Sequence, residues 1–269
     1  MHSTGVIFKR TLYDNRRGIF WWSLGIGLMG FYVVVAYPMV EGLEEFGQIM
    51  DNPVFKVLLG DVGQLEWTSP EGFMGIEFFS WIPLVLAVYG VMFGVNITSG
   101  EEDRGTIDIL LSTPTPRWQV IVEKFLAYVV GVGLILGITA VVMLIGIAIT
   151  PKMQGSEGTM FWGMLNIMPP MLFIGALTLL LSTLVRSPGR ASGISAGIMI
   201  ASYFINSLAD MTNNALMGAL QYLSFYKYFA PLTVASEGID PGNFSILLLL
   251  SALLFGLSIY FFERRDLYV

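Results

Sequence analysis

Six stretches of 19 to 28 residues contain no charged side chain, and they constrain the fold of this chain more than any other feature. They cover residues 18–40, 78–100, 125–150, 158–185, 191–209 and 241–262. About 20 apolar residues in a helix cross the hydrocarbon core of a bilayer. Lipid cannot hydrogen-bond an exposed backbone, whereas a helix satisfies its own backbone groups. The sequence therefore predicts an all-α integral membrane protein with six transmembrane helices.

The composition favours one membrane domain over residues 1–269. Only 13% of the residues are charged, against roughly 25% in soluble domains, and no connecting segment reads as a domain of its own. There is no cysteine, so disulfides and thiolate chemistry are excluded. The expected spans are about 18–40, 78–100, 120–150, 160–185, 191–209 and 242–262.

The residues before the first span predict an interfacial helix over 1–17. On a helical wheel Phe8 and Leu12 lie on one side, and Arg10, Asp14 and Arg17 lie on another. Such a helix would rest on the cytoplasmic leaflet with its arginines near anionic head groups. A basic flank that only sets the topology explains the same residues equally well.

The distribution of basic residues predicts that both termini are cytoplasmic. With six spans in this orientation, 11 Lys and Arg residues lie inside and 3 lie outside. Cytoplasmic segments of membrane proteins carry such an excess of Lys and Arg.

Glycines recur at helix-packing spacings. Gly25, Gly27 and Gly30 match G-x-G-x-x-G, but that motif binds dinucleotides only between a strand and a helix, so close helix packing is the better interpretation. Three further pairs have the G-x-x-x-G spacing: Gly90 and Gly94, Gly133 and Gly137, Gly193 and Gly197. Packing within one subunit and contact between subunits both explain this spacing.

Two outer connections are long. The segment 41–77 contains eight acidic residues, one Lys and no His, which is typical of a solvated acidic face and supports metal binding only weakly. The segment 210–240 is rich in Leu, Tyr and Phe. It is expected to form a helix that lies on or dips into the outer leaflet.

The segment 101–118 reads EEDRGTIDILLSTPTPRW and lies between the second and third spans. Gly105 or Thr106 can begin a short helix, and Asp108 would complement the positive end of its dipole. Three apolar residues share one face by their spacing: Ile107, Leu110 and Leu111. Pro114 and a second proline then end the helix. Such a helix either lies on the membrane or docks into a groove of a soluble partner.

This segment resembles the ATP-binding-cassette (ABC) exporter permeases of the second integral-membrane type. The matching residues are Glu101, Glu102, Gly105, Thr106, Asp108, Leu110, Leu111, Pro114, Arg117 and Lys124. The C-terminal stretch from Tyr260 to Leu267 and the order of elements are also similar to this family. The resemblance covers the whole chain as topology and is specific in 101–124.

The resemblance implies a six-span half-transporter in the plasma membrane of a prokaryote. Two copies, or two different permeases, would pair among the membrane lipids, and cytoplasmic ABC ATPase subunits would bind below; no nucleic acid is involved. The loop after the second span would be the coupling helix. The ATPase-coupling residues would be Glu101, Glu102, Gly105, Thr106, Asp108, Leu110, Leu111, Pro114 and Arg117.

The chain lacks the phosphate-binding loop of a nucleotide hydrolase. No G-x-x-x-x-G-K-S/T sequence occurs, and no lysine follows a glycine, so any ATP hydrolysis belongs to another chain. We therefore predict a transport subunit that is not an enzyme. It would have no catalytic residue, metal or cofactor of its own, with ATP and Mg on the partner ATPase.

An ion-coupled secondary transporter is the alternative function. Such carriers keep ionisable groups within the membrane, and the six uncharged stretches have none, although backbone carbonyls can also bind ions. Pro169 and Pro170 could break the fourth span for that purpose. An intramembrane enzyme would need clustered catalytic groups, but the only histidine is His2. A purely structural membrane anchor is a further alternative. An uncharged interior suits an amphipathic, lipid-like or drug-like substrate.

Overall fold

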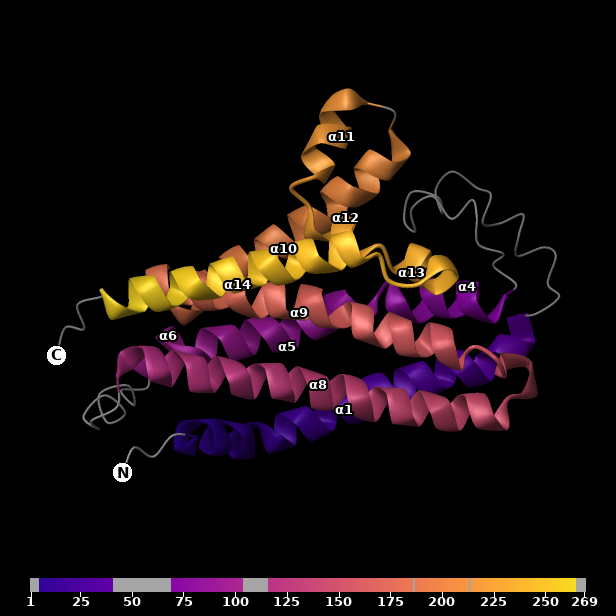
Figure 1. Ribbon diagram of the computed structural model, residues 1–269, viewed down its shortest axis with the longest axis horizontal. Helices are drawn as coiled ribbons and strands as arrows, with labels where there is room; N and C mark the ends of the chain where they lie inside the picture. The colour runs from indigo at the N-terminus through magenta and orange to yellow at the C-terminus, as the bar shows by residue number, and fades with distance from the viewer. Residues whose placement is uncertain (1–4, 41–68, 104–115, 186, 213, 265–269) are drawn as a thin grey trace.

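A computed structural model describes residues 5–40, 69–103, 116–185, 187–212 and 214–264. The long helices lie side by side in one bundle, and α11 projects from its side (Figure 1). In chain order the elements are α1 (Val6–Val40), α4 (Pro70–Met74), the π-helix η1 (Gly75–Phe79), α5 (Ile82–Ile97), α6 (Ser99–Asp103), α8 (Arg117–Ile149), the 3-10 helix η2 (Pro151–Met153), α9 (Glu157–Val185), α10 (Pro188–Met211), α11 (Ala215–Gln221), α12 (Phe225–Phe229), α13 (Pro231–Glu237) and α14 (Pro241–Glu263).

Six helical segments in the described ranges are long and apolar enough to cross a membrane. They are α1, the combined α4–η1–α5 segment, α8, α9, α10 and α14. This confirms the predicted all-α fold with six transmembrane helices. The first turns of α1 and the last turns of α14 lie at the same end of the bundle (Figure 1).

The first span and the expected interfacial helix form one element. Helix α1 runs without interruption for 35 residues, or about 52 Å at 1.5 Å per residue. This exceeds the roughly 30 Å of the hydrocarbon core, so its first turns extend beyond that core. The helix is continuous because no proline interrupts its backbone hydrogen bonds before Pro38.

The second span begins earlier than the expected residue 78. The Ser69 side chain accepts a hydrogen bond from the Gly72 amide, and Pro70 occupies the first helical position. The π-turn at η1 follows, where the Ser80 hydroxyl donates to the Gly75 carbonyl at 2.8 Å. Glu71 and Glu77 of the expected acidic face therefore lie on helices. Residues 41–68 lie outside the described residues.

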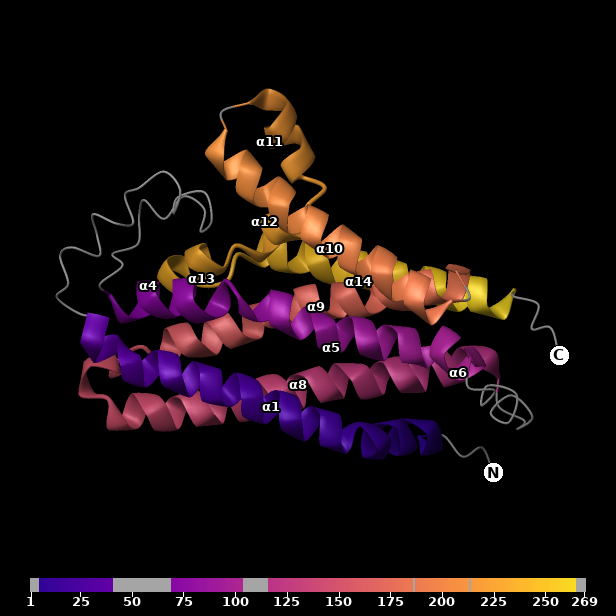
Figure 2. The ribbon, with the colours of Figure 1, turned by 180° about the vertical axis from the view of Figure 1, so that it is seen from behind.

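The bundle is centred on α5, α8 and α9. The rings of Tyr89 and Tyr128 stack with centroids 6.0 Å apart, and the Tyr128 hydroxyl donates to the Met171 carbonyl at 2.6 Å. Helix α1 packs along α8, and α10 lies beside α5 in the opposite view (Figure 2). Helix α9 is continuous through Pro169 and Pro170, so these prolines do not break the fourth span.

The glycine pairs differ in their surroundings. A Cβ added at Gly90 or Gly94 would contact Ile174 or Thr178 of α9, so this pair packs within the subunit. At the other two pairs, no described atom lies within 4 Å of an added Cβ: Gly133 and Gly137, Gly193 and Gly197. Glycine pairs with the same sequence spacing therefore lie in different surroundings in the described part of the chain.

The connection between the last two spans contains three short helices rather than one. Leu216 and Leu223 are exposed, whereas Tyr226 of α12 is buried. The Asn166 side chain of α9 donates to the Phe229 carbonyl at 2.6 Å, and Ser202 of α10 hydrogen-bonds Ser224 at 2.9 Å. These bonds fix α12 between α9 and α10.

Candidate functional site

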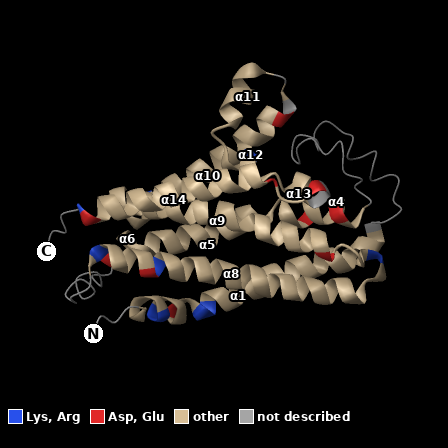
Figure 3. Ribbon diagram, viewed as in Figure 1, with Lys and Arg blue, Asp and Glu red and all other residues tan. Residues whose placement is uncertain are grey.

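Charged side chains gather at the two ends of the bundle and are sparse along its middle (Figure 3). At the end where α1 begins, the chain leaves the bundle through α6 and returns as α8 (Figure 1). Of the predicted coupling residues, Glu101, Glu102 and Arg117 are at this end. The others lie outside the described residues: Gly105, Thr106, Asp108, Leu110, Leu111 and Pro114.

A buried ion pair joins α6 to α8. The Lys124 ammonium contacts the Glu101 carboxylate and donates to the Ile97 carbonyl at 3.4 Å. The side chains of Lys124 and Glu101 are only 5% and 17% exposed. A buried pair resists separation because either charge alone would lie in a poorly solvating environment. The start of the predicted coupling loop is therefore attached to the third span.

Ser182 of α9 forms hydrogen bonds to the α5–α6 junction from the other side. The Ser182 hydroxyl lies 2.6 Å from the Thr98 hydroxyl and 2.7 Å from the Ser99 hydroxyl. It also accepts from the Ser99 amide at 3.1 Å. All three residues are buried. The α5–α6 junction thus contacts both α8 and α9.

Glu123 attaches the beginning of α1 to α8. Its carboxylate accepts from the backbone amides of Gly5 at 2.9 Å and Phe8 at 3.0 Å. The side-chain amide of Gln119 donates to it at 2.8 Å. The first amides of a helix have no partner within the helix, and a negative charge is favourable at that end. Glu123 therefore caps α1 from a position 115 residues or more along the chain.

Glu123 and Ser182 are site residues that sequence analysis missed. Lys124 entered only through the family resemblance and was not among the predicted coupling residues. The available signal was the adjacent Glu123–Lys124 pair just before a long uncharged stretch. Neighbouring helical residues point about 100° apart, so the two side chains reach different partners. Together with Glu101 and Ser182 they form what we call the junction cluster.

Replacing Glu123 with alanine should loosen the first turns of α1. The Gly5 and Phe8 amides would lose their acceptor, and loss of a capping side chain costs about 0.5–2 kcal/mol. Hydrogen exchange at residues 6–10 should accelerate, with little change in the middle of α1. Glu123→Gln, which keeps a neutral acceptor, should give an intermediate effect. Equal exchange in all three proteins would contradict the capping role.

The described residues contain no group of three or more His, Cys, Asp and Glu side chains that could bind a metal ion. The absence of a cofactor and of enzymatic activity on the whole chain stays a prediction. The junction cluster contains no nucleophile–base pair among these residues. The cluster instead has a mechanical role, because it connects three spans, α1, α8 and α9, to α6, where the chain leaves the bundle.

Comparison with known proteins identifies the family of this chain. The family model described as "ABC-2 family transporter protein" matches residues 6–267. The chain is also 30% identical over 146 residues to a protein from Stutzerimonas stutzeri named "Probable ABC transporter permease protein NosY". That match covers 51% of this chain and 50% of the relative, so it spans about half of each. This chain belongs to the ABC-2 transporter family and is a membrane protein of the permease type.

Proposed function

We propose that this permease is half of an ATP-driven exporter that moves an amphipathic, lipid-like or drug-like substrate out of the cytoplasm. A separate ABC ATPase, with its own ATP and Mg, would supply the energy. The positive-inside bias supports cytoplasmic termini, and the bacterial relative supports the plasma membrane of a prokaryote. The observation that carries the proposal is the Lys124–Glu101 pair, which attaches the loop expected to contact the ATPase to the spans.

The junction cluster supplies a route for movement. A partner that pushes on the segment after Asp103 would move α6, and the ion pair would carry α8 with it. Glu123 would then carry the beginning of α1, since its carboxylate holds two amides of that helix. The ATPase would bias the permease between two conformations by binding one of them better than the other.

A second permease, either a copy of this chain or a paralogue, would cover part of the exposed apolar surface. Helices α10 and α14 are the least buried spans within one chain. Gly193 and Gly197 of α10 have no described atom near them, and such positions allow close approach of another helix. Lipid would cover the remaining apolar surface.

Replacing Leu110 and Leu111 with aspartate should uncouple ATP hydrolysis from transport. The change places two charges on the predicted apolar face of the coupling segment, which lies outside the described residues. We expect at least a tenfold fall in substrate moved per ATP hydrolysed, measured in liposomes with the ATPase. Leu216→Asp with Leu223→Asp is the matched control, because both side chains are exposed on the connection between the last two spans.

The decisive test of the assignment is purification from the native host with a tag on this chain only. A stoichiometric ABC ATPase should co-purify. Its consistent absence, together with transport driven by an ion gradient without nucleotide, would replace the proposal with an ion-coupled carrier.

A further inference from the structure

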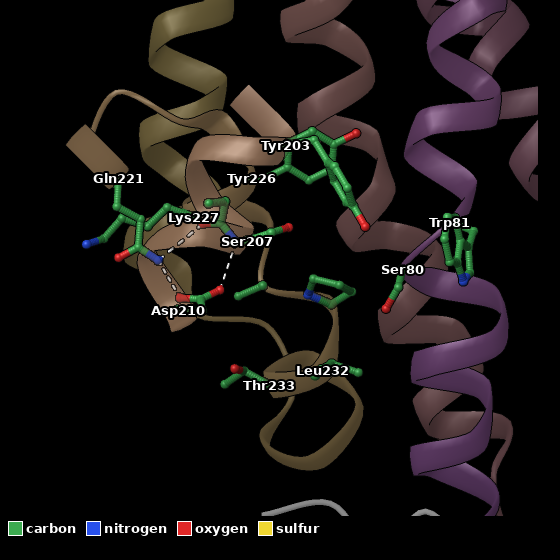
Figure 4. Close-up of a pocket in the computed structure, with 13 residues that line it drawn as sticks. Ser80, Trp81, Tyr203, Ser207, Asp210, Gln221, Tyr226, Lys227, Leu232 and Thr233 are labelled. Atoms are coloured by element: carbon green, nitrogen blue, oxygen red, sulfur yellow. Dashed lines mark hydrogen bonds between the residues drawn. The ribbon is translucent and has the colours of Figure 1, made fainter. Parts of the chain in front are cut away.

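A cavity of about 300 Å³ lies between α10, α11, α12, α13 and the η1–α5 junction (Figure 4). This volume is at the lower end of the range for small-molecule sites, about 300–1,000 Å³. It would accommodate one polar head group rather than a complete amphiphile. The junction cluster does not contribute to it, so the cavity is a separate feature of the permease.

Three side chains form a pre-organised polar wall. The Asp210 carboxylate accepts from the Gln221 amide at 2.6 Å and from the Asn206 amide at 3.1 Å. Gln221 also donates to the Asn206 side-chain oxygen at 3.3 Å. Figure 4 shows Asp210 and Gln221 on one side of the cavity, with Ser80 and Trp81 on the opposite side. Fixed polar groups reduce the entropy lost when a ligand binds.

A buried hydroxyl without a partner lies in the cavity lining. Tyr226 is 6% exposed, and its phenolic oxygen has no hydrogen-bond partner among the described residues. Leaving such a group unpaired costs about 1–3 kcal/mol. The ring is fixed in place because it packs edge-on against Tyr203, with centroids 5.4 Å apart. The Ser224 side chain also accepts from the Tyr226 amide. The hydroxyl oxygen is covered by protein atoms, so Tyr226 contributes its fixed ring to the lining.

The cavity lies about one hydrocarbon thickness along the helices from the end of the bundle that contains the junction cluster. Ser80 is 17 residues from Ile97, about 26 Å along the helix, and Asp210 is 22 residues from Pro188, about 33 Å. The hydrocarbon core is about 30 Å thick. From Trp81 an exposed apolar stripe follows α5 toward the junction cluster: Trp81, Val85, Val88 and Met92. Their spacing of four, three and four residues places them on one helix face.

The lining contains one basic and one acidic residue, Lys227 and Asp210, so its charges balance and favour an uncharged head group. Lys227 is the only basic residue among the lining residues, and its ammonium lies over the Tyr222 ring, 3.2 Å from the centroid. What remains is one carboxylate, amides, hydroxyls and aromatic rings. Amides and hydroxyls both donate and accept, which suits a ligand whose own groups do both.

We propose that this cavity binds the uncharged, hydroxyl-bearing head group of an amphiphile, whose tail lies along the exposed stripe of α5. The inference rests on the proposed function, since it names the substrate class of the exporter. Ligand hydroxyls would bond the Asp210 network, and the aromatic rings would cover the apolar faces of the head group.

The test uses the full chain in lipid nanodiscs and three probes with the same eight-carbon tail. The probes are n-octyl β-D-glucoside, octyl phosphate and octyltrimethylammonium, each below its micellar concentration. Displacement of radiolabelled octyl glucoside is measured, with empty nanodiscs as background. We expect the glucoside to compete best. Asp210→Ala should weaken its binding at least about tenfold, as expected for the loss of hydrogen bonds to a charged group.

Tyr222→Phe is the matched control, because this exposed tyrosine is in the same connection but does not line the cavity. Its affinity for the glucoside should be unchanged. Asp210 is exposed, so Asp210→Ala should fold normally. Unchanged glucoside binding in the folded Asp210→Ala variant would overturn the proposal. Preferential binding of the ammonium probe, lost in Asp210→Asn, would also overturn it.

The outcome is separable from the proposed function because the assay needs neither ATP nor an ATPase. If the glucoside binds as expected and no ATPase co-purifies, the cavity assignment stands and the exporter proposal fails. If an ATPase co-purifies and couples to transport while the glucoside does not bind, the reverse holds.

Discussion

Replacing Lys124 with methionine should lower the free energy of unfolding by about 3–5 kcal/mol, the cost of leaving one member of a buried ion pair without its partner. The Glu101 carboxylate would remain in a mostly buried position without the ammonium that contacts it. Unfolding of the purified permease in mixed micelles, followed by circular dichroism, would measure this loss.

The matched control is the Arg10–Asp14 pair, whose side chains are 77% and 53% exposed. Arg10→Met should change stability by less than about 1 kcal/mol, because water already screens that pair. Equal losses in the two variants would show that burial of the Lys124–Glu101 pair adds nothing to the free energy of unfolding.

The double variant Lys124→Met with Glu101→Leu separates stability from coupling. Removing both side-chain charges leaves no unpaired charge, so stability should largely return. If the pair transmits movement from the ATPase, substrate moved per ATP should stay low in this stable protein. Full recovery of transport would limit the pair to a structural role.

Replacing Gly175 with alanine should destabilise the bundle by about 1–3 kcal/mol, the usual cost of overpacking a core. The added Cβ would lie 2.2 Å from a ring carbon of Tyr128. Two carbon atoms that are not bonded to each other overlap sterically at this distance. Tyr128 cannot move away freely because it is fully buried and donates to the Met171 carbonyl. A fall in the thermal midpoint of the purified permease is the expected measurement.

Gly137→Ala is the control for that substitution. No described atom lies within 4 Å of a Cβ added there, and alanine is favoured over glycine within a helix by about 1 kcal/mol. Its thermal midpoint should therefore be unchanged or higher. A similar fall in both variants would mean that the Tyr128 contact is not what excludes a side chain at Gly175.

The family resemblance pointed to the segment after the second span, and the role of its residues in coupling stays a prediction. Glu101 and Arg117 were predicted from a local pattern, and the structure places both where the chain leaves and re-enters the bundle. Glu123 was not predicted as a site residue, because its partners Gly5 and Phe8 are 118 and 115 residues away. No local spacing indicates which distant amides a carboxylate will accept from.

Two boundaries differ between the sequence analysis and the structure. The residues near the N-terminus suggested an interfacial helix before the first span, and in the structure both belong to the continuous helix α1, whose one proline, Pro38, lies in its last turn. Glu71 and Glu77 suggested a loop, yet Ser69 and Pro70 begin a helix there. Capping residues determine where a helix begins more directly than the position of charged side chains.

The sequence by itself determined the class of this protein and its number of spans. Bilayer thickness and backbone hydrogen bonding act on each uncharged segment separately, so that information is local. Only the tertiary structure decided which glycines face a neighbouring helix, which charges are buried together, and which short helices enclose the cavity beside Tyr226. Those properties depend on contacts between residues far apart in the chain, and these contacts arise only when the helices pack.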